Sequence, residues 1–242
     1  MTIKSQTLSY AAGEDELKGY MAYDDTSGSP KPGVIVVHEW WGLDDYIRTR
    51  ADKLAELGYA ALAIDMYGNG ATADSPDEAG AMMNAVLGNM EIGTSRLRAA
   101  HEVLCAQPMV DETRTAAIGY CFGGAMVLHM ARIGMPLKAV VSFHGALGSF
   151  HAPTPGEIKS RILVCHGAKD SLVPENDIES FNAEMASAQA NVKFESYEGA
   201  LHGFTNPDAT ERGQSYGLPL AYDQRADEAS WSEMKALFNE VF

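Results

Sequence analysis

Short apolar, β-branched runs alternate with segments of helical periodicity along nearly the whole chain, and this alternation limits the folds open to it. Val34-Ile35-Val36-Val37 is one such run, and an unbroken apolar run is typical of a strand buried on both faces. Leu and Ala then recur at helical spacing over residues 44–57, and Gly58 follows as a suitable C-cap. The alternation predicts one mainly parallel, doubly wound sheet with helices on both faces.

The same patterns predict the other elements. Residues 6–24 have the pattern of two short strands around Gly13-Glu14-Asp15, which predicts an N-terminal antiparallel hairpin, followed by a Ser/Gly/Pro-rich link over 25–33. Further strands are expected at 59–64, 115–119, 139–143, 162–165 and 192–197. Helices are expected at 122–132, 174–189 and 222–242, with helical stretches over 76–106 that break at Gly88 or Gly93. Because no polar linker or repeat divides the 242 residues, we predict a single domain, 1–242.

Charge and cysteine usage argue against several classes of function. With 33 acidic and 18 basic residues the formal charge is -15, and an acidic surface repels the phosphates of nucleic acid. The three cysteines, Cys105, Cys121 and Cys165, form no Cys-x-x-Cys pair, so we expect no disulfide framework and a reducing compartment. The N-terminal residues lack the apolar stretch of a secretion signal, and no run approaches the ~18 apolar residues of a membrane span. We therefore expect a cytoplasmic protein with no membrane partner.

Gly119-Tyr120-Cys121-Phe122-Gly123 lies between a predicted strand and a predicted helix, at the sheet edge where open parallel sheets bind ligands. The pattern is a Gly-x-Ser-x-Gly nucleophile turn with Cys in place of Ser. Small residues are needed in such a turn because it is strained and another stretch of backbone passes close to it. The start of the following helix favours negative charge on the sulfur or on a nearby oxyanion. Cys121 is therefore a candidate nucleophile, and the alternative is a buried cysteine that only packs.

An acid and a histidine follow Cys121 in the chain order that such a nucleophile needs. Asp170 comes after the strand expected at 162–165, and His202 comes after the strand expected at 192–197. Taken singly, Asp170 could cap the helix that follows it, and His202 could be a surface histidine. Taken together, the order favours a triad in which His202 activates Cys121 and Asp170 holds the imidazole in the required tautomer.

Five motifs lie at or beside the predicted strand ends. They are Val37-His38-Glu39-Trp40-Trp41-Gly42-Leu43, Asp65-Met66-Tyr67-Gly68, Gly119-Tyr120-Cys121-Phe122-Gly123-Gly124, His166-Gly167-Ala168-Lys169-Asp170 and His202-Gly203-Phe204. Together they resemble the dienelactone hydrolase (carboxymethylenebutenolidase) family, and the similarity runs over most of the chain. The resemblance implies an α/β-hydrolase fold and the cleavage of an ester or lactone by a Cys-His-Asp triad, through a thioester acyl-enzyme.

The resemblance also gives Glu39 a role that a serine-type triad lacks. In the family, the resting glutamate holds the cysteine as a thiol; substrate displaces the glutamate, which takes the thiol proton, and the thiolate pairs with the histidine. Burial beside Trp40 and Trp41 should raise the pKa of this carboxyl group and make it a base. The alternative is that Glu39 only binds a backbone amide. The oxyanion would accept hydrogen bonds from the backbone N–H groups of Phe122 and, by resemblance, Trp40.

The residues expected to contact substrate depart from the family pattern. The dienelactone enzyme uses arginines for the substrate carboxylate, and Asn206 stands where one of them follows the catalytic histidine by four residues. Arg212 could replace it. Trp41, Tyr67 and Phe204 instead indicate an apolar or aromatic pocket, although core packing explains such residues equally well.

No cofactor or metal is expected. His38, His144 and His166 have no partner at metal-ligand spacing, and no glycine-rich nucleotide loop follows a strand. Met82, Met83 and Met90 are interpreted as core filler. The expected partner is a small-molecule ester or lactone, bound by a monomer or homodimer. Two alternatives stay open: a broad carboxylesterase or thioesterase for hydrophobic esters, and a ligand sensor that Cys121 acylates without turnover.

Overall fold

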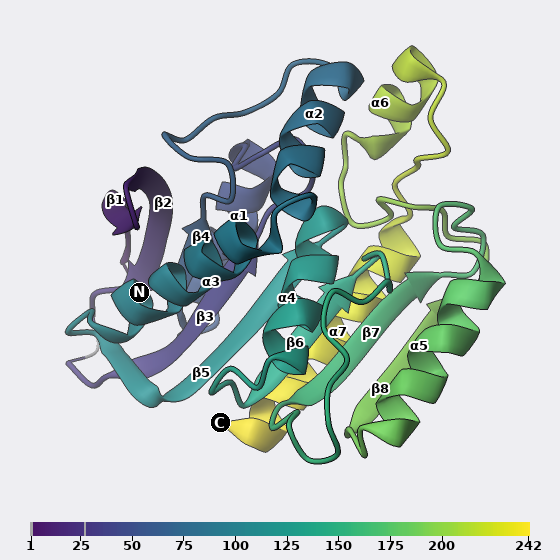
Figure 1. Ribbon diagram of the computed structural model, residues 1–242. Coiled ribbons are helices and arrows are strands. Elements are labelled where there is room, and N and C mark those ends of the chain that lie inside the picture. Colours follow the sequence, from purple (N-terminus) through teal and green to yellow (C-terminus); the bar gives the residue numbers. More distant parts are fainter. Residues whose placement is uncertain (1, 27) are drawn as a thin grey trace. The chain divides into compact units, whose positions relative to one another are not determined.

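The computed structural model describes residues 2–26 and 28–242, which form eight strands and seven helices (Figure 1). The chain divides into two compact units, residues 1–118 and 119–242. The two units are described in turn, and the single domain inferred from the sequence stays a prediction.

The first unit opens with the expected antiparallel hairpin. Strands β1 (Ile3–Ala12) and β2 (Asp15–Asp24) have ten residues each and pair from Ile3↔Asp24 to Ala12↔Asp15, so they are longer than predicted. Gly13, with φ of 64°, supplies the left-handed residue of the turn. Along the chain follow β3 (Lys31–Val37), α1 (Asp45–Glu56), β4 (Ala60–Ile64), α2 (Pro76–Leu87), α3 (Met90–Cys105) and β5 (Val110–Tyr120).

The strands of the first unit have the order β1-β2-β4-β3-β5. Strand β2 pairs antiparallel with β4, whereas β3 pairs parallel with β4. Every residue of β4 is buried, so this strand must be covered on both faces. Helices α1 and α3 both pack against β3 and β4 and supply that cover. The predicted change from an N-terminal hairpin to parallel strands is confirmed.

Two strand starts differ clearly from those predicted, and the helical stretch breaks at one of the two glycines expected. Strand β3 begins at Lys31, within the expected link, because the Lys31 N–H donates to the carbonyl of Met109 over 2.8 Å. The helical stretch breaks at Gly88, the C-cap of α2, whereas Gly93 lies inside α3, where a Cβ would meet the Val86 side chain at 3.2 Å. Strand β5 starts five residues before the predicted position. The sequence did not reveal this start because the first half of the strand is mostly polar and contains no apolar run. Ser27 of the expected link lies outside the described residues.

The second unit contains the end of β5, α4 (Phe122–Arg132), β6 (Ala139–Phe143), β7 (Arg161–Gly167), α5 (Glu175–Ser187), β8 (Val192–Tyr197), α6 (Ala209–Tyr216) and α7 (Gln224–Val241). Strands β6, β7 and β8 are parallel neighbours in that order. Every residue of β6 is buried, and α4 and α7 both pack on it, so helices again cover both faces. Helix α6 was not predicted because its sequence is mostly polar and small.

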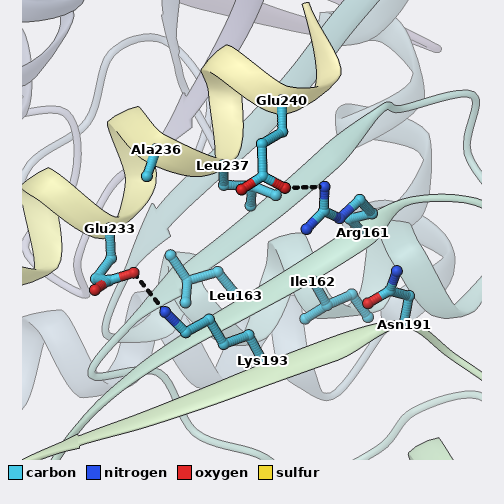
Figure 2. A pocket seen from close by; sticks show the side chains of 9 residues that line it. All are labelled: Arg161, Ile162, Leu163, Asn191, Lys193, Glu233, Ala236, Leu237 and Glu240. Atoms are coloured by element: carbon cyan, nitrogen blue, oxygen red, sulfur yellow. Dashed lines mark hydrogen bonds and ion pairs between the residues drawn. The ribbon is translucent and has the colours of Figure 1, made fainter.

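Helix α7 is tied to its neighbouring strands by ion pairs as well as by apolar packing. Figure 2 shows Lys193 of β8 paired with Glu233 at 2.6 Å and Arg161 of β7 paired with Glu240 at 2.5 Å. The space between them is only about 60 Å³, too small for an organic substrate. Across the described residues, none of the helices combines the length and apolar character that a membrane crossing requires.

Candidate active site

Cys121 occupies a strained turn between β5 and α4. Its φ of 53° and ψ of -115° are unusual for a residue with a side chain. The Cys121 N–H donates to the carbonyl of Phe143 at the end of β6 over 3.0 Å, which anchors the turn. Helix α4 begins at the next residue, Phe122, so the positive end of the helix dipole lies directly beside the thiol.

Two glycines make room for this turn. A Cβ on Gly119 would lie 2.1 Å from the carbonyl oxygen of Gly123, and a Cβ on Gly124 would lie 2.7 Å from the Cα of Gly145. Backbone atoms cannot move aside as the end of a flexible side chain can. Glycine is therefore required at both positions for a steric reason, independent of any role in chemistry.

Asp170 and His202 form a buried pair. His202 Nδ1 lies 2.7 Å from Asp170 Oδ2, and the other carboxylate oxygen accepts the N–H of Leu172 at 2.9 Å. The alternative that Asp170 caps the next helix is wrong, because α5 has Pro174 at its N-cap and no side-chain cap. The alternative of a surface histidine is wrong as well, because His202 is only 6% exposed.

The environment of His202 favours its charged form. Burial alone lowers the pKa of this imidazole, but the negative charge that the Cys121 sulfur carries whenever it is a thiolate and the hydrogen bond to Asp170 outweigh burial and raise the pKa well above the usual 6.5. His202 Nε2 is buried; no described residue meets it with full hydrogen-bond geometry, yet the Cys121 sulfur lies close enough to contribute to the raised pKa of the ring. This nitrogen is thus available for proton exchange with the nearby sulfur.

His144 is a site residue that the sequence did not reveal, since only metal binding was considered for it. Its ring lies edge-on to that of His202, with centroids 5.2 Å apart, and its Nε2 lies 2.7 Å from Thr205 Oγ1. Its position directly after β6 was the available signal. His144 restricts the space in which the His202 ring can turn. In the part of the chain that is described, no group of three His, Cys, Asp or Glu residues could hold a metal ion.

The residues after His202 that were predicted to contact substrate all make contacts within the protein. Phe204 is fully buried and packs against His144 and Tyr197. Asn206 is 1% exposed, and its Oδ1 accepts the N–H of Asp208 at 2.9 Å. Arg212, on α6, lies 4.0 Å from the Asp208 carboxylate. A role for these residues in substrate binding stays a prediction.

The loop after β3 is buried in the first unit. Glu39 and Trp41 are each 5% exposed, and the rings of Trp40 and Trp41 meet edge to face at 4.9 Å. The Tyr67 hydroxyl donates to the carbonyl of Trp40 over 2.8 Å. Tyr67, predicted as a substrate contact, therefore also holds the backbone of this loop.

A cavity of about 210 Å³ lies in the first unit beside Tyr67. Helix α2 contributes Met82, Ala85 and Val86 to its lining, and α3 contributes Ile92 and Arg96. Tyr67 and Ala71, from the segment between β4 and α2, complete the lining. Arg96 donates to the Met66 carbonyl and to Asp15, at 2.6 and 2.8 Å. The interpretation of the three methionines as core filler fails for Met82, which lines this cavity.

The family model described as the dienelactone hydrolase family matches residues 17–242. The chain belongs to this family. A structure named m3DLH is 39% identical with a TM-score of 0.93, and a dienelactone hydrolase-like promiscuous phosphotriesterase from metagenomic libraries is 36% identical with a TM-score of 0.91; both matches cover 100% of each chain. A protein of Synechocystis sp. that bears a provisional carboxymethylenebutenolidase name is 30% identical over 98% of this chain and 94% of its own.

These similarities establish the fold of the chain and its class of activity. The α/β-hydrolase fold predicted from the sequence is confirmed. The chain is a dienelactone hydrolase-like hydrolase, as predicted.

Gly119→Ala should destabilise this dienelactone hydrolase relative by at least about 3 kcal/mol, because the new methyl group overlaps backbone that cannot retreat. Gly148→Ala is the matched control, since a Cβ there meets nothing within 4 Å. Urea denaturation of both variants checks the prediction. Equal free energies of unfolding for the two variants would contradict the prediction, because they would show that the turn can accept a Cβ at Gly119.

Asp170→Asn should lower kcat by about 10³–10⁴-fold, because an amide no longer fixes the imidazole tautomer. It should also lower the pKa of His202, since Asp170 is one of the groups that raise it. NMR titration of the His202 ring should therefore show deprotonation at lower pH than in the unmodified protein. An unchanged titration at reduced kcat would contradict the electrostatic role of Asp170.

Proposed function

We propose that this chain hydrolyses uncharged, apolar esters or lactones through a thioester on Cys121. The observation that carries the proposal is the buried Asp170–His202 pair, whose imidazole pKa the Cys121 thiolate raises. The strained turn and helix start at Cys121 support the nucleophile role. The chemistry needs no cofactor.

The reaction follows from the charges of these groups. The Cys121 thiolate attacks the carbonyl carbon while His202 is protonated, and the tetrahedral oxyanion collapses to a thioester as the leaving oxygen takes the proton from His202. Water then gives a proton to His202 and attacks the thioester. Collapse of the second oxyanion releases the acid, and the sulfur leaves as thiolate beside the re-protonated imidazole.

Two further roles are carried over from the family resemblance. Glu39 takes the thiol proton when substrate enters and returns it to the sulfur after the acid has left; its burial supports this role because a carboxyl group shielded from water is a stronger base. The oxyanion accepts hydrogen bonds from the backbone N–H groups of Phe122 and Trp40. The first of these N–H groups belongs to the first residue of α4, at the positive end of the helix dipole.

The arginine contacts favour an uncharged substrate over an anionic dienelactone. Asn206 replaces the family arginine, Arg212 lies beside Asp208, and Arg96 donates to Met66 and Asp15. Binding a carboxylate normally requires a fixed guanidinium. The 210 Å³ apolar cavity beside Tyr67 suits a small alkyl or aryl group instead.

The chain should release p-nitrophenol steadily from p-nitrophenyl acetate, and Cys121→Ser should lose most of this activity. The high pKa of a serine hydroxyl defeats a carboxylate base. Glu39→Gln keeps the shape but cannot take a proton, and it should also be slow. A mass increase of one acetyl group on Cys121 identifies the intermediate. Near-normal rates in Cys121→Ser would contradict the role of Glu39.

The sensor alternative is separated by the same assay. A single burst of p-nitrophenol without continued release would favour covalent capture over hydrolysis. An anionic dienelactone assayed in parallel separates a lactonase specific for anions from a general esterase, because the proposal expects the uncharged aryl ester to be the better substrate.

We propose that the apolar group of the substrate occupies the cavity beside Tyr67; Met82→Gln should then raise KM for an aryl ester about tenfold, because it places a polar amide against that group. Met83→Gln is the matched control, since Met83 is the next residue of α2 and does not line the cavity. Steady-state kinetics on both variants checks this. Similar KM values in the two would place the substrate's apolar group elsewhere.

A second candidate function is hydrolysis of phosphotriesters. The observation behind it is the 36% identity, over the full length of both chains, to a promiscuous phosphotriesterase. Here the Cys121 sulfur would displace an aryloxide from phosphorus, and water would then cleave the S–P bond. Release of p-nitrophenol from diethyl p-nitrophenyl phosphate, absent in Cys121→Ala, tests it.

We also propose that the protein works in the cytoplasm as a monomer or homodimer. Cys105, Cys121 and Cys165 are all free thiols, which supports a reducing compartment.

A further inference from the structure

His38 is a fully buried imidazole at the end of β3, and the reaction above gives it no part. Its two nitrogens have different partners. Nδ1 lies 2.5 Å from the carbonyl oxygen of Glu39, and Nε2 lies 3.2 Å from the backbone nitrogen of Met66.

These partners fix the tautomer of His38. A backbone N–H can only donate, so Nε2 must accept from Met66, and the one proton of the neutral ring stays on Nδ1. A carbonyl oxygen can only accept, so Nδ1–H donates to Glu39. Burial lowers the pKa of His38 despite the opposing effects of the Glu39 carbonyl and Asp65, which keeps the ring neutral.

The Glu39 carbonyl shares a peptide group with the Trp40 N–H. A trans peptide is planar, and its C=O and N–H point in opposite directions. A donor that holds the Glu39 oxygen therefore also sets the direction of the Trp40 N–H. The Gly42 N–H reaches the same oxygen at 3.3 Å, so His38 is the closer of two donors.

The next peptide is held from the other side. The Tyr67 hydroxyl donates to the Trp40 carbonyl over 2.8 Å, and the Tyr67 ring lies edge-on to His38 with centroids 4.8 Å apart. Tyr67 is itself fixed by its own N–H, which donates to Asp65 Oδ1 over 2.9 Å. Packed, hydrogen-bonded side chains thus restrain both peptides that flank the Trp40 Cα.

We infer that His38 is a positioning residue, whose Nδ1–H orients the Glu39–Trp40 peptide so that the Trp40 N–H is directed to receive an oxyanion. The inference rests on the proposed function, in which this N–H is one of two oxyanion donors. A preorganised donor is worth about 10²–10³ in kcat, so the loss of its alignment should cost a measurable part of that factor.

Two substitutions of His38 separate its two hydrogen bonds. The Gln side chain reaches the place of Nε2 and can accept from Met66, but it has no donor for Glu39. The Asn side chain places a donor near Nδ1 but leaves Met66 without its acceptor. His38→Gln should lower kcat on p-nitrophenyl acetate by about 10–10²-fold with little change in KM, whereas His38→Asn should keep a higher kcat.

Alkylation of Cys121 by iodoacetamide is the control, because it needs the thiolate but no oxyanion hole. Its rate should be unchanged in His38→Gln. Tyr67→Phe, which removes only the donor to the next carbonyl, should show the same signature more weakly: lower kcat at an unchanged alkylation rate. Thermal melts of all variants record their stability. If the kcat values rank with the melting temperatures, and not with the presence of a donor at the Nδ1 position, the inference is overturned.

The two levels of the proposal fail in different ways. If Cys121→Ala keeps the esterase activity, the proposed function is wrong and the role of His38 falls with it. If Cys121→Ala is inactive but His38→Gln and His38→Asn have equal kcat, or His38→Gln slows alkylation as much as turnover, only the positioning role is wrong.

Discussion

The hydrogen bond from the Cys121 N–H to the Phe143 carbonyl holds a residue with φ of 53° at the start of a buried helix, and the candidate site depends on it. A positive φ at a residue with a side chain costs of order 1–3 kcal/mol, so surrounding packing must enforce it. Gly119 and Gly124 permit that packing by letting backbone approach where any Cβ would collide. The strain therefore has a structural counterpart, and it leaves the thiol beside the first turn of α4.

Charge in the second unit is balanced within a small buried group. Burial disfavours a charged imidazole, yet the Cys121 thiolate and Asp170 together raise the pKa of His202. Each group needs the others, because a buried charge without a partner is costly. His144 adds a restraint without charge, since its ring limits His202 while Thr205 holds its own Nε2. Hydrogen bonding and packing thus keep His202 in one orientation.

The sequence predicted those parts that local patterns determine. Strands such as β3 and β4 were recognisable because they are apolar on both faces, and Cys121, Asp170 and His202 because each follows a strand in the chain order of a triad. Helix α6 was missed since its residues show no apolar periodicity, and the start of β5 since Asp111 to Arg114 are polar. The roles of His144 and Tyr67 depend on partners far away in sequence, such as Thr205, 61 residues from His144. No local pattern contains that information.

The two proposed oxyanion donors also differ in this way: local structure sets the direction of one, and side chains distant in sequence set the direction of the other. The Phe122 N–H is directed by secondary structure, because Phe122 is the first residue of α4 and the helix sets the direction of its backbone. The Trp40 N–H has no helix to direct it and depends on His38, Gly42 and Tyr67, which act on the carbonyls at either side of the residue. A backbone-determined donor tolerates most side-chain substitutions, whereas a donor held by side chains can be weakened by a single one. In the proposed oxyanion hole, the loop after β3 is therefore the part in which side-chain chemistry, rather than fold, would set the strength of the hydrogen bond.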